Sequence, residues 1–320
     1  MVIEKLKKYK IGVLAGGVSS EREISLKSGK AVFEAFSKCG LNTVFLDVED
    51  REFERSIKGS GIDLAFIALH GKFGEDGAVQ ERLAAMNILY TGSPPAASRN
   101  ALDKIISKEI FKENGILIAE HEVIKAGEGT ASLTMEPPYV VKPRREGSSI
   151  GLTVVFTKEK LESAVKEALL FGSEALVEKY IAGREITVGI LENKALPIVE
   201  IIPGSGTYDF HSKYSSDKTK YIVPAEFDKH VYLKAQKDAL KAHSALGCKG
   251  FSRVDMMVTG DNDVFILEVN TIPGLTERSL LPMAAREAGL DFSRLCVRMV
   301  LAAISGQSEQ KKSKVQRSKV

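Results

Sequence analysis

Phe251-Ser-Arg-Val-Asp-Met-Met-Val258 and Val264-Phe-Ile-Leu-Glu-Val-Asn270 are two apolar stretches that flank the polar cluster Thr259-Gly-Asp-Asn-Asp263. Strand-like runs on both sides of such a cluster predict a β-hairpin. Asp261 and Asn262 tolerate the positive φ angles of a two-residue turn, so we place the turn on them. With this turn, the pairing of every residue in the two strands follows.

The predicted register brings four polar side chains to one face of the hairpin. Asp255 falls opposite Glu268. Two residues along, on the same face, Arg253 falls opposite Asn270. Carboxylates at opposite positions, with Cβ atoms roughly 4.5–5.5 Å apart, repel each other unless one is protonated or a cation bridges them. Oxygen ligands without cysteine or histidine favour Mg²⁺ or Mn²⁺, which take further ligands from phosphates and water. The alternative is a solvated polar face on which Arg253 pairs with Asp255.

Length and composition limit the classes of protein. The chain has 320 residues, 44% hydrophobic and 27% charged, as expected of a globular protein with two or three domains. Its net charge of +3 arises in residues 306–320, which carry +4, so the body gives no basic footprint for nucleic acid. Three scattered cysteines without metal-ligand spacing indicate a reduced, cytoplasmic protein. Neither an apolar run of ~20 residues nor a signal-peptide pattern is present, so we expect no membrane association.

Apolar periodicity predicts an α/β protein with several domains. Strands such as Ile11–Ala15 alternate with helical patterns in the first part, which predicts a Rossmann-like parallel sheet covered on both faces. The breaker cluster Thr91-Gly-Ser-Pro-Pro95 ends that part, and a helix over Ala101–Glu113 opens a small α+β unit. Long strands joined by turns then predict a large, mainly antiparallel sheet. We place the domains at 1–96, 97–182 and 183–305, followed by a disordered basic tail at 306–320.

Two segments of the central unit have residue types that suit a nucleotide. Val141-Lys-Pro143 leads into Arg144-Arg-Glu-Gly-Ser-Ser-Ile-Gly151, where backbone N–H groups, hydroxyls and the Lys142 ammonium suit a phosphate. Glu178-Lys-Tyr-Ile-Ala-Gly-Arg-Glu185 joins two strands, and its backbone and carboxylates suit adenine and ribose. Taken singly, each segment is also compatible with an ordinary surface connection.

Other segments offer groups for small anionic or cationic ligands. In Asn270-Thr-Ile-Pro-Gly-Leu-Thr-Glu-Arg-Ser279, a backbone N–H of the turn suits an oxyanion and the helix start suits a carboxylate. His70-Gly-Lys-Phe-Gly-Glu-Asp-Gly77 and Ser19-Ser-Glu-Arg-Glu23 follow strands of the predicted parallel sheet, where ligands bind. Glu21 suits a substrate ammonium. The alternatives are a structural histidine, plain turns and helix caps.

In this order, the segments resemble those of D-alanine–D-alanine ligases, which are ATP-grasp enzymes. The resemblance covers about residues 10 to 305. The matching segments are Gly16–Ser25, His70–Gly77, Val141–Gly151, Glu178–Glu185, Tyr208–Tyr214, Arg253–Asp255 and Glu268–Ser279. The resemblance implies an ATP-grasp fold and a cytoplasmic homodimer that joins two D-alanines with ATP and two Mg²⁺ or Mn²⁺ ions. Its product would serve peptidoglycan synthesis and hence the cell wall and cell shape.

The resemblance also implies a role for each matching residue. The implied phosphate ligands are Lys104, Lys142 and Lys213. The implied adenine and ribose contacts are Glu178, Lys179, Ile181 and Glu185. The implied metal ligands are Asp255, Glu268 and Asn270. The implied substrate contacts are Glu21 and His70 for the first ammonium, Arg253 and the Gly274 N–H for the oxyanion, and the Ser279 and Leu280 N–H groups for the second carboxylate.

The polar stretch Gly204–Lys220 resembles the loop that closes over the site in this family. There, Tyr214 is expected to meet Glu21 and Ser148. These three residues are candidates for relaying the proton of the second amine, and the alternative is a substrate that enters as the free amine. D-Lactate or D-serine as second substrate, or a nucleotide-binding homologue without turnover, are alternative functions.

Overall fold

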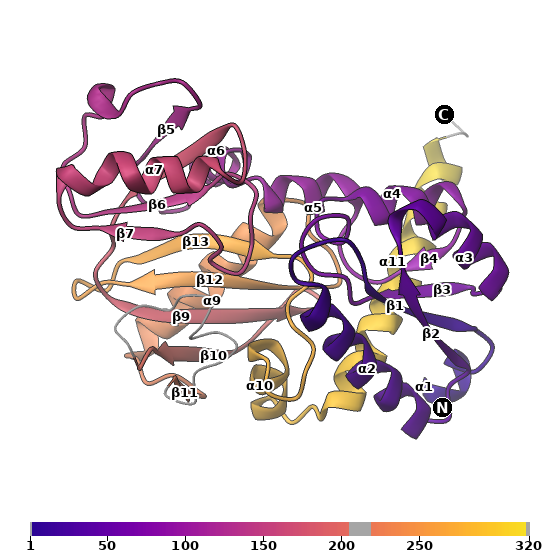
Figure 1. Ribbon diagram of the computed structural model, residues 1–320. Helices are drawn as coiled ribbons and strands as arrows, with labels where there is room; N and C mark the ends of the chain where they lie inside the picture. Colours follow the sequence, from indigo (N-terminus) through magenta and orange to yellow (C-terminus); the bar gives the residue numbers. More distant parts are fainter. Residues whose placement is uncertain (1, 205–218, 318–320) are drawn as a thin grey trace.

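The structure is a computed structural model that describes residues 2–204 and 219–317. It contains three β-sheets, which Figure 1 shows as the N-terminal sheet on the right, a small central sheet at the upper left and a large sheet below the small one. The predicted α/β class, with parallel and antiparallel parts in this order, is confirmed. The boundaries that we placed between the domains stay a prediction.

The N-terminal sheet is parallel and has the strand order β2-β1-β3-β4. Its strands are β1 (Ile11–Gly16), β2 (Thr43–Val48), β3 (Leu64–Ile67) and β4 (Leu89–Tyr90). The helices of this part are α1 (Val2–Leu6), α2 (Arg22–Lys38), η1 (Asp50–Glu52), α3 (Phe53–Ser60) and α4 (Ala78–Ala85). Every residue of β1 and β3 is buried, as expected for strands covered on both faces. The loops after β1 and β3 therefore open at one edge, where Glu21 and His70 lie.

The central unit has an antiparallel sheet in the order β5-β8-β6-β7. Its strands are β5 (His121–Lys125), β6 (Tyr139–Pro143), β7 (Thr153–Val155) and β8 (Glu174–Lys179). Its helical elements are α6 (Lys104–Glu113), η2 (Thr130–Ser132), η3 (Lys158–Lys160) and α7 (Leu161–Leu169). The apolar face of α7 packs on the sheet through Leu161, Ala164, Val165 and Ala168.

The helix predicted over Ala101–Glu113 is confirmed as α6 with its end at Glu113, but its predicted start is wrong. The structure has two helices there, because α5 (Pro95–Leu102) ends and α6 begins on either side of Asp103. Asp103 has an extended backbone with ψ of 101°, and its carboxylate accepts the Ile106 N–H at 3.3 Å. An aspartate in this position caps a new helix and thereby interrupts the old one.

The large sheet is antiparallel and has the order β11-β10-β9-β12-β13. Its strands are β9 (Arg184–Leu191), β10 (Lys194–Ile202), β11 (Lys220–Ile222), β12 (Phe251–Val258) and β13 (Val264–Asn270). Helix α9 (Lys229–Ala245) covers one face, and α10 (Leu280–Glu287) packs on β9 and β10. The face of the sheet that α9 does not cover lies toward the other parts of the chain, and the candidate functional site lies on this face.

The turn predicted for the β12–β13 hairpin is wrong, although the predicted pairing of the polar residues is confirmed. Thr259 donates its N–H to Asp263 O at 3.0 Å, so three residues rather than two form the loop. Leu267 is then the extra residue of a β-bulge, since Met256 pairs with Ile266 while Asp255 pairs with Glu268. The extra residue of the bulge compensates for the extra residue of the loop. Asp255 and Glu268 are therefore paired as predicted, with the polar side chains on one face.

Helix α11 (Phe292–Arg317) connects the C-terminal part back to the N-terminal domain. It packs on α2 and β4, as Figure 1 shows by the yellow helix beside the indigo elements. The helix continues into the stretch that we expected to be a disordered tail. In the part of the chain that the structure describes, no helix is long and apolar enough to cross a membrane.

Candidate functional site

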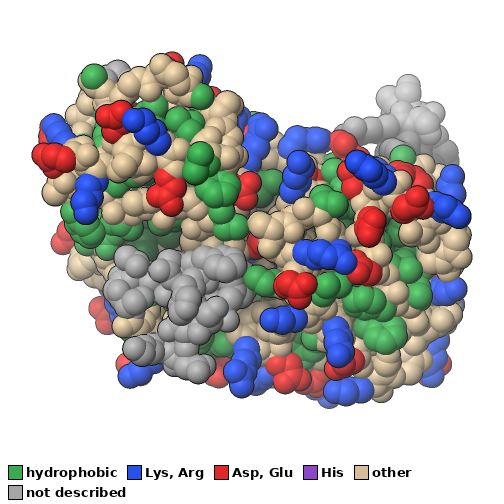
Figure 2. Space-filling view, viewed as in Figure 1, with side chains coloured by type: hydrophobic (Ala, Val, Ile, Leu, Met, Phe, Trp, Pro, Cys, Tyr) green, Lys and Arg blue, Asp and Glu red, His purple; other side chains and the backbone are tan. Residues whose placement is uncertain are grey.

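Two cavities lie against the face of the large sheet that α9 does not cover. The N-terminal cavity is lined by the loops after β1 and β3, by the end of β13 and by the start of α10. The central cavity is lined by β6, β7, the β8–β9 connection and the face of β12 and β13. Figure 2 shows apolar side chains gathered where the central unit meets the large sheet. The two cavities share the lining residues Lys104, Glu146 and Glu268, so they meet at these side chains.

Every predicted site residue that the structure describes lines one of these cavities. In the N-terminal cavity lie Glu21, His70, Ser148, Arg253, Asn270, Gly274, Ser279 and Leu280. In the central cavity lie Lys142, Glu178, Lys179, Ile181, Glu185 and Asp255. Lys104 and Glu268 line both cavities. Lys213 and Tyr214 lie outside the described residues. The structure thus places the predicted residues together, while their individual roles stay predictions.

The polar face of the β12–β13 hairpin is partly buried: Asp255 is buried, and Arg253, Glu268 and Asn270 are half-buried. The Arg253 guanidinium donates from Nε and Nη2 to the two Asp255 carboxylate oxygens, at 2.8 and 2.6 Å. The Thr187 hydroxyl on the neighbouring strand β9 also donates to Asp255 Oδ1, at 2.7 Å. The pairing in our alternative hypothesis is therefore present, but Asp255 is only 7% exposed, so its solvated setting is wrong.

A second buried ion cluster holds the cations of the central cavity. Glu178 Oε1 lies 2.8 Å from Lys108 Nζ and 3.0 Å from Lys142 Nζ. Burial opposes ionisation of Glu178, but the two ammonium groups outweigh it and lower the pKa of the carboxyl to about 2. Burial lowers the pKa of Lys104 and of Lys108, because the charged form loses its water. The sequence reasoning missed Lys108, although it lies one helical turn after Lys104.

The loop after β6 reaches across to the N-terminal domain. Ser148 donates its hydroxyl to the Glu21 carboxylate. Ser148 and Ser149 have φ angles of 51° and 58°, a backbone region that residues other than glycine seldom adopt. A Cβ atom on Gly147 would lie 3.2 Å from Glu21 Oε2, so glycine allows this close approach. The β6–β7 loop and the loop after β1 therefore form one wall of the N-terminal cavity.

His70 fixes the floor of the same cavity. Its Nε2 lies 3.0 Å from Ser28 Oγ on α2, and its Nδ1 lies 3.0 Å from the Ile272 carbonyl oxygen. Ser28 Oγ also accepts the Leu275 N–H at 3.2 Å, so helix α2 holds the turn that contains Gly274. Glu75 Oε1 lies 3.6 Å from His70 Nδ1, and burial raises the pKa of the Glu75 carboxyl. We missed Glu75 as a site residue, although it lies within the predicted loop His70–Gly77.

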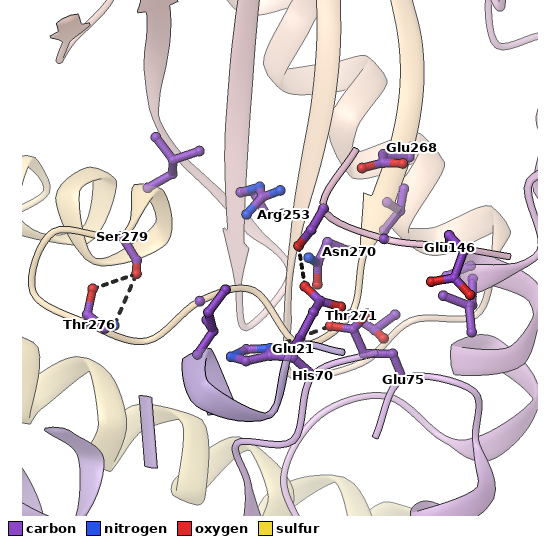
Figure 3. A pocket seen from close by; sticks show the side chains of 18 of the residues that line it. Glu21, His70, Glu75, Glu146, Arg253, Glu268, Asn270, Thr271, Thr276 and Ser279 are labelled. Carbon is purple, nitrogen blue, oxygen red and sulfur yellow. Dashed lines mark hydrogen bonds and ion pairs between the residues drawn. The ribbon is translucent and has the colours of Figure 1, made fainter. Parts of the chain in front are cut away.

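The start of α10 lies on another side of the N-terminal cavity. Ser279 Oγ accepts the Thr276 N–H at 3.1 Å and lies 2.9 Å from Thr276 Oγ1. Figure 3 shows these two residues on one side of Arg253, with Glu146 on the other side and Glu21 and His70 below. Because α10 begins at Leu280, the first N–H groups of the helix have no partner within it. This end of the helix can bind a carboxylate.

The arrangement defines the class of protein. A small antiparallel sheet and a large antiparallel sheet enclose a cavity with buried lysines and apolar walls, and a parallel-sheet domain completes a second cavity beside it. This is the architecture of an ATP-grasp enzyme.

Comparisons with known proteins identify the family. The family models "D-ala D-ala ligase N-terminus" and "D-ala D-ala ligase C-terminus" match residues 48–93 and 109–301. A D-alanine–D-alanine ligase of Citrifermentans bemidjiense is 48% identical over 95% of this chain and 99% of its own length. One of Geobacter sulfurreducens is 43% identical over 95% and 96%. The solved structure of the Bacillus anthracis D-alanine–D-alanine ligase complexed with ATP matches with a TM-score of 0.82 and 34% identity, over 94% of this chain and 99% of that one. The chain belongs to the D-alanine–D-alanine ligase family.

Proposed function

We propose that this protein is an ATP-dependent ligase that joins two D-alanines to give D-alanyl-D-alanine, ADP and phosphate. The observation that carries the proposal is that two cavities of different chemistry meet at Lys104, Glu146 and Glu268. A nucleotide in the central cavity would point its terminal phosphate at this junction. A small amino acid in the N-terminal cavity would then present its carboxylate to that phosphate.

The central cavity suits ATP in both its charged and its apolar parts. Lys104 and Lys142 supply ammonium groups for the phosphates, and Val140, Ile150 and Met257 supply apolar wall for a base. Lys179, Ile181 and Glu185 lie in the connection that we assign to adenine and ribose. Glu178 binds Lys108 and Lys142, so its side chain also orders the phosphate ligands.

The donor set fits two divalent cations that are bound largely through the nucleotide. Asp255, Glu268 and Asn270 offer carboxylate and amide oxygens, and Asp255 and Glu268 both line the central cavity. In residues 2–204 and 219–317, no group of three or more His, Cys, Asp or Glu side chains is placed so that it could hold a metal ion by itself. This fits Mg²⁺ or Mn²⁺, which take most ligands from phosphates and water. The ions would neutralise the phosphates during transfer.

The residues of the N-terminal cavity would position the two amino acids. Glu21 would bind the ammonium of the first D-alanine, and the α10 N-terminus at Ser279 and Leu280 would bind the carboxylate of the second. The first carboxylate attacks the γ-phosphate and gives an acyl phosphate, whose carbonyl the second amine then attacks. Arg253 and the Gly274 N–H would stabilise the oxyanion of the resulting tetrahedral intermediate.

The proton of the second amine has a structural candidate as its acceptor. Ser148 and Glu21 are joined by a hydrogen bond at the edge of the N-terminal cavity, so a proton can pass between them. Our hypothesis adds Tyr214, which lies outside the described residues. We further propose that the enzyme is a cytoplasmic homodimer and that its product serves peptidoglycan synthesis.

The test is phosphate release from ATP with and without D-alanine, combined with identification of the product by mass. Release that depends on D-alanine and yields D-alanyl-D-alanine supports the proposal. If D-lactate or D-serine is added in competition and the main product contains it in place of the second D-alanine, the protein is a ligase with another second substrate. ATP binding without any phosphate release would indicate a nucleotide-binding homologue instead.

A further inference from the structure

Asp103 is a buried carboxylate that lines neither cavity, yet it is joined to the loop between them. Its side chain lies at the break between α5 and α6, and the residue is 1% exposed. Capping α6 needs only one hydrogen bond, which Asp103 accepts from the Ile106 N–H. The carboxylate can accept further hydrogen bonds, and it accepts them from the β6–β7 loop.

Two consecutive arginines of the β6–β7 loop bind this one carboxylate. Arg144 Nε lies 2.8 and 2.9 Å from its two oxygens, and Arg144 Nη2 lies 2.7 Å from Oδ2. Arg145 donates from Nε to Oδ2 at 2.8 Å, and its Nη2 lies 2.7 Å from the same oxygen. Burial opposes ionisation, but the two guanidinium groups prevail and lower the pKa of Asp103. The carboxylate is therefore charged when it holds the loop.

The residue after Asp103 binds the next part of the same loop. Lys104 donates its backbone N–H to the Arg144 carbonyl oxygen at 3.1 Å, and its ammonium donates to the Glu146 carbonyl oxygen. Arg144 also pairs with Glu174 at the start of β8. The start of α6 thus fixes the chain at residues 144, 145 and 146. Beyond them lie Gly147 and Ser148, which line the N-terminal cavity.

We propose that Asp103 is a positioning residue for the phosphate-binding loop 144–151. This inference rests on the proposed function, in which ATP occupies the central cavity, and on the sequence-based prediction that loop 144–151 binds its phosphates. Asp103 does not touch substrate; it acts through Arg144 and Arg145. If Asp103 loses its charge, Arg144 and Arg145 lose the carboxylate that holds loop 144–151 beside Lys104. The nucleotide then binds to a loop that is less well positioned. The amino-acid contacts on α10 lie on a different element and keep their positions.

Asp103→Ser separates this role from helix capping, because serine caps a helix about as well as aspartate but gives the arginines no carboxylate. We expect Asp103→Ser to raise the KM for ATP and the Kd for ADP about tenfold, by analogy with residues that orient metal ligands, whose mutation typically costs about 10–100-fold. The KM for the second D-alanine, whose contacts lie on α10, should change less than about threefold, whereas the KM for the first should also rise, because Gly147 and Ser148 of the same loop line the N-terminal cavity. Arg145→Gln, at a side chain that is 62% exposed, should shift the same two nucleotide constants in the same direction by a smaller factor.

Glu192→Gln is the matched control. Glu192 pairs with Arg298, whose Nε lies 3.0 Å from Glu192 Oε1, and neither residue lines a cavity. This variant should leave the nucleotide constants unchanged. An ADP affinity equal to that of the wild type in Asp103→Ser would overturn the inference. If that variant does not fold, an unchanged ADP affinity in Arg145→Gln overturns it instead. Wild-type protein that binds ADP but makes no dipeptide would refute the proposed function, and the ADP affinities of the variants would still decide the role of Asp103.

Discussion

The central cavity and the N-terminal cavity hold their buried carboxylates in different electrostatic states. In the central cavity, Glu178 is paired with Lys108 and Lys142, which lower its pKa to about 2. In the N-terminal cavity, burial raises the pKa of Glu75, whose Oε1 lies 3.6 Å from His70 Nδ1. A site for a polyanion such as ATP needs its cations held in place before the ligand binds. In the central cavity, the buried Glu178 carboxylate holds two lysine ammonium groups in this way. A site for a zwitterion instead presents carboxylates to the ligand ammonium.

The largest effect that this comparison predicts is on stability. Glu178→Gln removes the carboxylate shared by two buried ammonium groups, and breaking a buried ion pair typically costs about 3–5 kcal/mol. Urea denaturation should show a loss of this order. Lys108→Met should lose less, because Glu178 keeps Lys142 as its partner. Equal stability of Glu178→Gln and wild type would mean that the lysines do not depend on this carboxylate.

Arg253→Ala tests the N-terminal cavity by its chemistry. Loss of one oxyanion donor typically reduces the rate on the order of 10²–10³-fold, and we expect this loss in dipeptide formation. ADP affinity should be largely kept, since Arg253 lines the N-terminal cavity and not the central one. Arg298→Ala removes the same charge away from both cavities and should retain turnover. Undiminished turnover in Arg253→Ala would refute the role of Arg253.

Ser28→Ala addresses the floor of the N-terminal cavity. The change leaves His70 Nε2 and the Leu275 N–H without the hydroxyl that they share, and an unsatisfied buried group costs about 1–3 kcal/mol. We expect a loss of stability in this range and a higher KM for D-alanine. Ser37→Ala on the same helix is the control, because Ser37 Oγ donates only to the Phe33 carbonyl oxygen at an exposed position. A Ser28→Ala variant as stable as this control would contradict the assignment.

The last prediction concerns the sign of the pH dependence of stability. The pKa of Glu178 is lowered from 4.5, so the stability of wild type relative to Glu178→Gln should increase as pH rises toward 4.5. The pKa of Glu75 is raised from 4.5, so the stability of wild type relative to Glu75→Gln should decrease as pH rises above 4.5. Unfolding free energies measured across this range test both. The same sign for the two pairs would show that the two cavities do not differ as described.

The sequence predicted the parts of the site that follow from local patterns. Asp255 and Glu268 were paired correctly because two errors offset each other: the bulge at Leu267 compensates for the third loop residue. The break at Asp103 was missed although aspartate is a typical helix N-cap, whereas the arginines that bind its carboxylate lie about forty residues away and could not be predicted. Lys108 and Glu75 were missed for a similar reason, because only tertiary packing buries them beside Glu178 and His70. Strands β5 and β11 escaped notice because their apolar patterns are short.

Phosphoryl transfer at the junction of Lys104, Glu146 and Glu268 is the step on which the proposed function depends most. Its direct test uses D-alanine labelled with oxygen-18 in the carboxyl group and mass analysis of the released phosphate. An acyl phosphate route transfers one carboxyl oxygen from the first D-alanine, so the account predicts that each phosphate formed carries one labelled oxygen. Unlabelled phosphate, released together with dipeptide, would show that the carboxylate never attacks ATP and would contradict the account.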